Sequence, residues 1–190
     1  MKIIDSLKGR RSIYDINKNL PVKEEVVFDF IKEATELVPD AFNMKSSRVV
    51  VVTKEKQDLL WDKIYEVFDG EVPREKIDSF KKGFGTILYF IDTSVVKGLE
   101  EQFPLYAPKF FEWAKQSAGM LELSIWSGLK ELSIGASIQH YNPIIDKMVK
   151  ELFDIPENYE LNAQMPFGGI NTEPSPKDKE DISLRVKFLN

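Results

Sequence analysis

Residues 87–91 are Ile87-Leu88-Tyr89-Phe90-Ile91, an apolar run in which polar and apolar residues do not alternate. A second run of this kind is Val49-Val50-Val51-Val52. Short β-branched and aromatic runs without alternation are typical of strands that are covered on both faces. The two runs therefore predict a sheet in the interior of the molecule.

Segments whose apolar residues have helical spacing lie before, between and after the two runs. Residues 23–37 carry apolar side chains at intervals of three and four, which predicts an amphipathic helix with one buried face. Residues 107–132 are apolar on more than one face and predict a long, largely buried helix. A shorter amphipathic stretch around residues 59–67 ends at the turn Asp69-Gly70. Together these patterns indicate an α+β fold with helices packed around an internal sheet.

Shorter patterns lie near both ends of the chain. An apolar stripe at the N-terminus predicts a helix that ends at Gly9, where a residue free to adopt positive φ turns the chain. Residues 135–138 and 161–167 predict strands. Between them, Asn142 is expected to cap a helix that starts at Pro143.

The C-terminal segment has a pattern of its own. A polar loop precedes apolar residues at alternate positions, which are Ile182, Leu184, Val186 and Phe188. This alternation predicts a half-buried strand, which needs a sheet edge from its own chain or from a partner. No internal repeat or composition break divides the chain, so we expect one domain over residues 1–190.

Composition narrows the chemistry. With 43% hydrophobic and 30% charged residues, the 190-residue chain has the composition of a soluble globular protein. The absence of Cys excludes disulfides, thiolate metal sites, cysteine-ligated iron-sulfur clusters and a cysteine nucleophile. Any redox chemistry must therefore be carried by a bound cofactor.

Charge and hydropathy argue against two classes of partner. The net charge is −5 without a long single-sign block, so little long-range field attracts a polyanion, and we expect no nucleic-acid partner. Charges interrupt the N-terminus before an apolar signal core can form, and no run approaches membrane-spanning length. We therefore expect a cytoplasmic protein that does not bind membranes.

The common catalytic motifs are missing. There is no Gly-x-Gly-x-x-Gly after a strand, no phosphate-binding Gly-Lys-Ser/Thr loop and no Gly-x-Ser-x-Gly elbow. His140 is the only histidine, so we expect no metal site. A lone histidine without an orienting partner is more often a packed or capping residue than a catalyst.

Two polar groups remain as candidate sites. Arg10 and Arg11 with Ser12 have the donors to grip a phosphate, although a solvated turn is the favoured interpretation from spacing alone. Asn43 and Lys45 have groups that can hydrogen-bond the polar edge of a planar heterocycle, although ordinary loop polarity explains them equally well.

Six segments, taken in their order along the chain, carry a resemblance. They are Arg10-Arg11-Ser12-Ile13-Tyr14, Pro39 to Arg48, Gln102 to Ala107, Gln116 to Met120, Gly135-Ala136-Ser137-Ile138-Gln139-His140-Tyr141-Asn142-Pro143 and Ala163 to Gly168. In this order they resemble one known family, the FMN-dependent nitroreductase-like proteins, and within it the small subgroup that includes fungal and bacterial proteins linked to fatty-acid repression. The resemblance covers nearly the whole chain.

The resemblance implies a fold and an assembly. Members of this family have a central, mostly antiparallel sheet flanked by helices and form an intertwined homodimer with FMN bound at the subunit interface. In this chain the resemblance assigns residues 170–190 to a C-terminal arm that reaches the partner subunit.

The resemblance also implies roles for individual residues. Arg10, Arg11 and Ser12 would hold the FMN phosphate and ribityl chain, helped by Lys177 and Lys179. Asn43 and Lys45 would approach the flavin ring across the interface. The Gln139-His140 backbone would lie near flavin N5, and no protein nucleophile would be needed.

The implied activity is hydride transfer from NADH or NADPH to a nitroaromatic, quinone or similar planar acceptor. Phe42, Phe103, Tyr106 and Trp113 are candidates for lining the acceptor cleft, although aromatic residues more often belong to the core. Two alternatives stay open at this point. One is a non-catalytic flavin-binding regulatory or stress-response protein, and the other is an interaction module without a cofactor.

Overall fold

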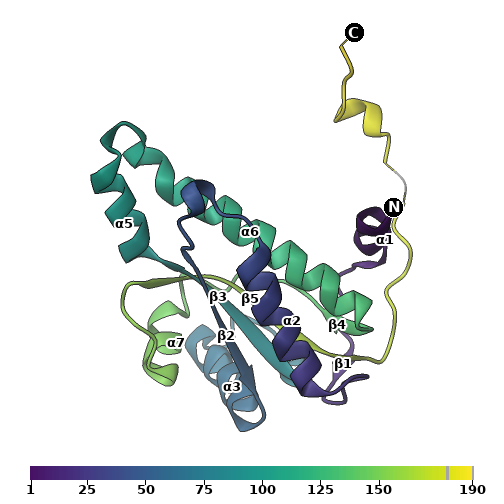
Figure 1. Cartoon of the computed structure of the whole chain (residues 1–190). Coiled ribbons are helices and arrows are strands. Elements are labelled where there is room, and N and C mark those ends of the chain that lie inside the picture. The colour runs from purple at the N-terminus through teal and green to yellow at the C-terminus, as the bar shows by residue number, and fades with distance from the viewer. Residues whose placement is uncertain (179, 190) are drawn as a thin grey trace.

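β3 (Gly85–Asp92) is buried along its whole length and lies between β2 (Ser47–Thr53) and β5 (Tyr159–Ile170). The computed structural model describes residues 1–178 and 180–189 (Figure 1). The short strands β1 (Ile16–Asn17) and β4 (Ile134–Ala136) both pair with β5. All pairs between these strands are antiparallel, which confirms the expected sheet.

Helices cover both faces of the sheet, as the helical spacings predicted (Figure 1). The core on one face lies under α6 (Ala107–Glu131) and α2 (Glu24–Leu37) and includes Ile87 and Tyr89. The core on the other face includes Leu88 and Phe90. The elements that cover this second face are α3 (Glu55–Phe68), α4 (Arg74–Lys81) and α7 (Asp146–Phe153). Alternate residues of β3 thus enter two different cores, which explains the lack of a polar face.

β2 is less deeply buried than β3. Of its residues, Val52 alone is fully buried, because β2 is an edge strand whose only neighbour is β3. The strand is confirmed, and so is its cover on both faces, because Val49 and Val51 pack against the core under α6 and α2 while Val50 and Val52 belong to the core on the other face. Beyond β3, α5 (Thr93–Gln102) leaves the sheet and packs beside α6.

The N-terminal helix is α1 (Lys2–Gly9), as predicted, but Gly9 does not end it by adopting positive φ. The chain leaves the helix at Arg10, whose φ of −70° and ψ of 124° are extended and whose amide donates to the carbonyl of Ser6. The apolar stripe of α1 is not buried in this chain, and Ile3 is 65% exposed.

One further prediction is wrong, and one of the two alternatives for the tail is excluded. Asn142 is not a helix cap, because α7 begins at Asp146 and its N-cap is Ile145. The alternating tail forms no strand within residues 171–178 and 180–189. It has instead a short 3₁₀ turn, Ile182–Leu184, so it does not pair with a sheet edge of its own chain. Pairing with a partner's sheet edge stays a prediction.

Within the described residues, no helix combines the length and the apolar character needed to cross a membrane.

Candidate functional site

Arg10, Arg11 and Ser12 lie where α1 joins the edge of the sheet. Ser12 forms a parallel bridge with Ala136 of β4, and the Ile13 amide donates to the Ala136 carbonyl at 3.0 Å. Trp126 of α6 donates from Nε1 to the same carbonyl, also at 3.0 Å. The arginine segment is therefore fixed between the sheet and the long helix.

The Arg10 guanidinium is preorganised without a counter-charge. It lies 4.0 Å from the centroid of the Trp126 ring, a cation–π contact, and its Nε is buried with no acceptor among the described residues. Neither Arg10 nor Arg11 forms an ion pair with a described Asp or Glu. Burial, followed by the charge of Arg11, lowers the pKa of Arg10. Two neighbouring cations without an acidic partner fit a phosphate, which would supply the missing charge and acceptors.

Gln139 and His140 continue the edge that begins with β4. Gln139 and Gln164 of β5 exchange backbone hydrogen bonds of 2.7 and 3.0 Å. The buried Gln164 side chain accepts from the Tyr141 amide at 2.8 Å and donates from Nε2 to Asn142 Oδ1 at 3.2 Å. Because the Gln139 amide is already used, the exposed His140 offers the amide that remains without an acceptor in the described chain.

Asn43 and Lys45 lie in a different part of the chain, after α2. They line a hollow of about 280 Å³ that is also bordered by Ser117 of α6. Phe42, Asn43 and Lys45 all have φ between 51° and 55°, a left-handed conformation that is uncommon for residues other than glycine. Asp40 holds this loop, because its Oδ2 accepts from the Ser46 amide at 3.0 Å and from the Ser46 hydroxyl at 3.1 Å.

The long helix separates these two groups within one chain. Ser117 borders the hollow, whereas Trp126 supports Arg10 nine residues later, which is roughly 14 Å along the axis of α6. The structure therefore brings Arg10–Ser12 to the same sheet edge as Gln139–His140, and it does not bring Asn43 or Lys45 to them.

The tail lysines are only partly described. Glu173, at the start of the tail, forms an ion pair with Lys130 at the end of α6, and α1 reaches the same helix end through Ser6, whose hydroxyl donates to Glu131 at 2.7 Å. Lys177 is exposed a few residues further on, where the tail leaves the body of the molecule (Figure 1). Lys179 lies outside the described residues.

The four predicted cleft aromatics come together. Phe42 stacks on Trp113 with ring centroids 5.7 Å apart and an interplanar angle of 14°. Its centroid also lies 5.3 Å from that of Phe103 and 6.0 Å from that of Tyr106. Phe42 remains 49% exposed, so this aromatic group is accessible at the surface of the chain.

Sequence reasoning missed three polar or aromatic groups that the fold places in the interior. Trp126 and Gln164 hold the two segments of the candidate FMN site. The carboxyl of Glu122 on α6 is buried and accepts from Asn162 Nδ2 at 2.6 Å, and burial raises its pKa. No spacing in the sequence marks these residues, because each role depends on contacts between distant segments.

Comparison with known proteins identifies the fold and the family. Residues 7–169 match the family model of the Nitroreductase family. The chain resembles the nitroreductase CinD from Lactococcus lactis, solved in complex with chloramphenicol, with 40% identity, a TM-score of 0.94 and coverage of 99% of this chain and 100% of CinD.

Two more distant relatives agree with this result. The nitroreductase FRM2 of Saccharomyces cerevisiae is 25% identical over 92% of this chain and 91% of its own length. A nitroreductase with bound FMN from Desulfitobacterium hafniense has the same fold, with a TM-score of 0.73 at 16% identity over 100% of this chain and 99% of its own. The chain therefore belongs to the nitroreductase family, whose members are FMN-dependent oxidoreductases with NADH or NADPH as electron donor.

Proposed function

We propose that two copies of this chain bind FMN between them and transfer hydride from NADH or NADPH to a nitroaromatic, quinone or similar planar acceptor. The observation that carries the proposal is the segment Arg10–Ser12, in which Arg10 lies over Trp126, Ser12 bridges to β4, and neither arginine has an acidic partner among the described residues. Bound FMN would supply the redox chemistry, since its ring takes up a hydride and passes two electrons onward.

The residues of the chain would bind and orient the cofactor. Arg10, Arg11 and Ser12 would neutralise and hydrogen-bond the phosphate, and the tail with Lys177 and Lys179 would add positive charge. The His140 amide would donate a hydrogen bond near N5 of the ring. Both groups belong to one sheet edge, so a single rigid surface sets the distance between phosphate and ring.

The second copy would complete the site. Asn43 and Lys45 are separated from the arginine segment along α6, which supports their approach to the flavin bound by the partner. An exposed lysine ammonium near the carbonyl edge of the ring would stabilise the negative charge that develops on reduction. Residues 170–190 would serve as the arm that reaches the partner.

The choice of acceptor has two supports. CinD has been solved in complex with chloramphenicol and with 4-nitrophenol, and for this chain we infer a small planar aromatic acceptor of the same kind. The exposed ring of Phe42, backed by Trp113, offers an aromatic face on which such an acceptor can stack.

The test is a visible spectrum of the purified protein before and after anaerobic addition of NADH. We expect a yellow protein that bleaches with NADH and recovers its colour when a nitroaromatic or a quinone is added. Steady NADH consumption that depends on the acceptor supports an enzyme. A protein that binds FMN and shows no acceptor-dependent turnover would be a flavin-binding regulator, and a colourless protein after incubation with FMN would contradict the proposal as a whole.

A further inference from the structure

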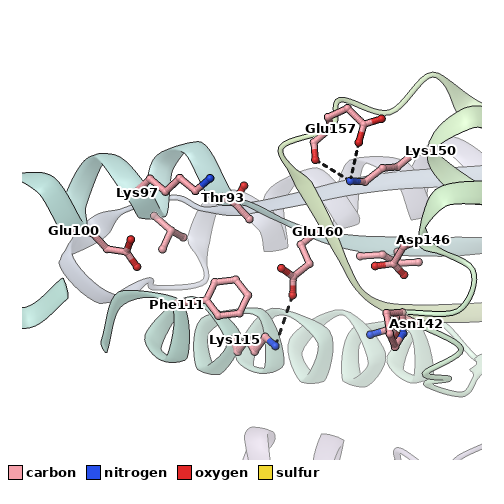
Figure 2. Close-up of a pocket in the computed structure, with 13 residues that line it drawn as sticks. Thr93, Lys97, Glu100, Phe111, Lys115, Asn142, Asp146, Lys150, Glu157 and Glu160 are labelled. Atoms are coloured by element: carbon pink, nitrogen blue, oxygen red, sulfur yellow. Dashed lines mark hydrogen bonds and ion pairs between the residues drawn. The ribbon is translucent and has the colours of Figure 1, made fainter. Parts of the chain in front are cut away.

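A cleft of about 860 Å³ opens between α5, α6, α7 and the start of β5 (Figure 2). Its lining includes none of the residues assigned to FMN. The volume falls in the range of small-molecule sites. Val96, Phe111 and Leu161 form an apolar part of the wall, and most of the other lining residues are charged.

Asp146, the first residue of α7, lines this cleft, and one oxygen of its carboxylate is shielded and lacks a donor. Its Oδ1 is buried and has no hydrogen-bond partner among the described residues. Burial, followed by the negative charge of Glu160, raises the pKa of Asp146 to about 6, and Lys150 opposes this effect. A partly shielded carboxylate without a positive partner is unfavourable, so a cationic ligand that binds the carboxylate from the cleft would be held there.

The lysines nearest to the acidic residues are already engaged. Lys115 Nζ lies 3.7 Å from Glu160 Oε1, and Lys150 Nζ donates to the Glu157 carbonyl at 2.7 Å (Figure 2). Neither lysine forms an ion pair with Asp146 in the described chain. Apart from these engaged groups, the lining has one cation, Lys97, and two carboxylates, Glu100 and Asp146. This excess of negative charge favours a cationic ligand over an anionic one.

The ligand set favours an organic cation over a metal ion. Among the described residues, no group of three or more His, Asp or Glu side chains is arranged to hold a metal. Phe111 offers an aromatic ring, and Lys115 Nζ already lies 4.6 Å from its centroid, which shows that this ring accepts a neighbouring cation. An arylalkylamine, which carries a positive charge and an aromatic ring, combines the two features that the cleft can recognise.

We propose that this cleft binds a small organic cation, a protonated arylalkylamine or arylamidine. Its N–H groups donate to the Asp146 carboxylate, and its ring lies against the apolar wall of Val96, Phe111 and Leu161. The site is separate from the FMN site, and its existence does not depend on the proposed reaction.

The probe is benzylamine, with benzyl alcohol as its neutral isostere. Both are titrated into the purified FMN-loaded protein by calorimetry or by NMR. The variants are D146N, which removes the charge, and E151Q, which removes an exposed carboxylate on the same helix outside the cleft. We expect saturable binding of benzylamine with a dissociation constant of about 1 mM, and binding at least about tenfold weaker for benzyl alcohol and for D146N. E151Q should bind benzylamine as the wild type does.

The pH dependence of benzylamine binding tests the proposal on the wild type, without a variant. The charged groups that line the cleft together with Asp146 are Lys97, Glu100, Lys115, Lys150, Glu157 and Glu160. Because the pKa of Asp146 is about 6, only about one molecule in ten carries the ionised carboxylate at about pH 5. Benzylamine stays protonated in this range, so its affinity should fall about tenfold between about pH 7.5 and pH 5.

Three results would overturn the proposal. They are the absence of saturable benzylamine binding, equal affinity for the neutral alcohol, and equal affinity in D146N. If D146N does not fold, the benzyl alcohol titration and the pH series on the wild-type protein decide the question.

Discussion

Arg10→Ala should weaken FMN binding by about 30- to 150-fold. The guanidinium is fixed over Trp126 at 4.0 Å and has a buried Nε without an acceptor, so it meets a phosphate at little additional ordering cost. Hydrogen bonds to a charged group contribute about 1.5–3 kcal/mol, and Arg11 remains to hold part of the charge. A loss of about 2–3 kcal/mol corresponds to the stated change in affinity.

The assay is a titration of FMN into the apoprotein, followed by the quenching of flavin fluorescence. Lys8→Ala is the matched control, since Lys8 is an exposed cation two residues before Arg10 and has no acidic partner in the described chain. This control should bind FMN within about a factor of two of the wild type. Arg10→Lys should give an intermediate affinity, because the charge stays and the paired donors are lost.

A second measurement separates folding from binding. Thermal unfolding of each apoprotein shows whether Arg10→Ala retains the native fold. If it does and still binds FMN as tightly as the wild type, the arginine pair is not the phosphate site and the assignment is wrong.

Three further predictions concern Trp126, Lys45 and Glu122. Trp126→Leu should weaken FMN binding about 5- to 30-fold by removing the ring under Arg10, with no further loss in the Arg10→Ala background; additive losses would show that the tryptophan does not act through Arg10. Lys45→Met should lower the flavin midpoint potential by about 10–30 mV, and an unchanged potential would refute its role near the ring. Burial raises the folded-state pKa of Glu122, so the stabilising contribution of this residue is lost as the pH rises through that pKa. Glu122→Gln should therefore raise the midpoint of thermal unfolding by about 2–4 °C at about pH 8 and change it little at about pH 4. An equal shift at both pH values would contradict the charge effect.

Local patterns predicted the elements whose burial is visible along the chain. The run at residues 87–91 is buried because β3 has strands on both sides and helices on both faces. The valines of β2 also contact both cores, but they are less deeply buried because β2 lies at the sheet edge, and strand order cannot be read from the run itself. The helix expected from Pro143 starts at Asp146, because the Gln164 side chain binds the Tyr141–Asn142 segment in another conformation.

The candidate site was predictable to the extent that it consists of short segments. Arg10–Ser12 and Gln139–His140 were identified by the family resemblance, and the bridge between Ser12 and Ala136 places them on one sheet edge. Trp126 was assigned to a buried helix face, and nothing in its spacing indicates a contact with Arg10. Such a contact arises when α1 crosses the end of α6, which is a property of the tertiary structure.

The surroundings of Arg10 lead to a last prediction, that FMN binding and dimerisation are linked. The segment is preceded by the exposed stripe of α1, and the tail, with Phe188 85% exposed, starts from the same end of α6. Apolar side chains with such regular spacing are expected to be buried by a second copy, since each Å² removed from water contributes about 25 cal/mol. Leu7→Glu, on the exposed stripe, should therefore weaken both dimerisation and FMN binding, whereas Lys8→Ala should change neither. Sedimentation with absorbance at the flavin band measures both quantities at once, and a Leu7→Glu monomer that retains FMN with wild-type affinity would show that one chain is sufficient for the site.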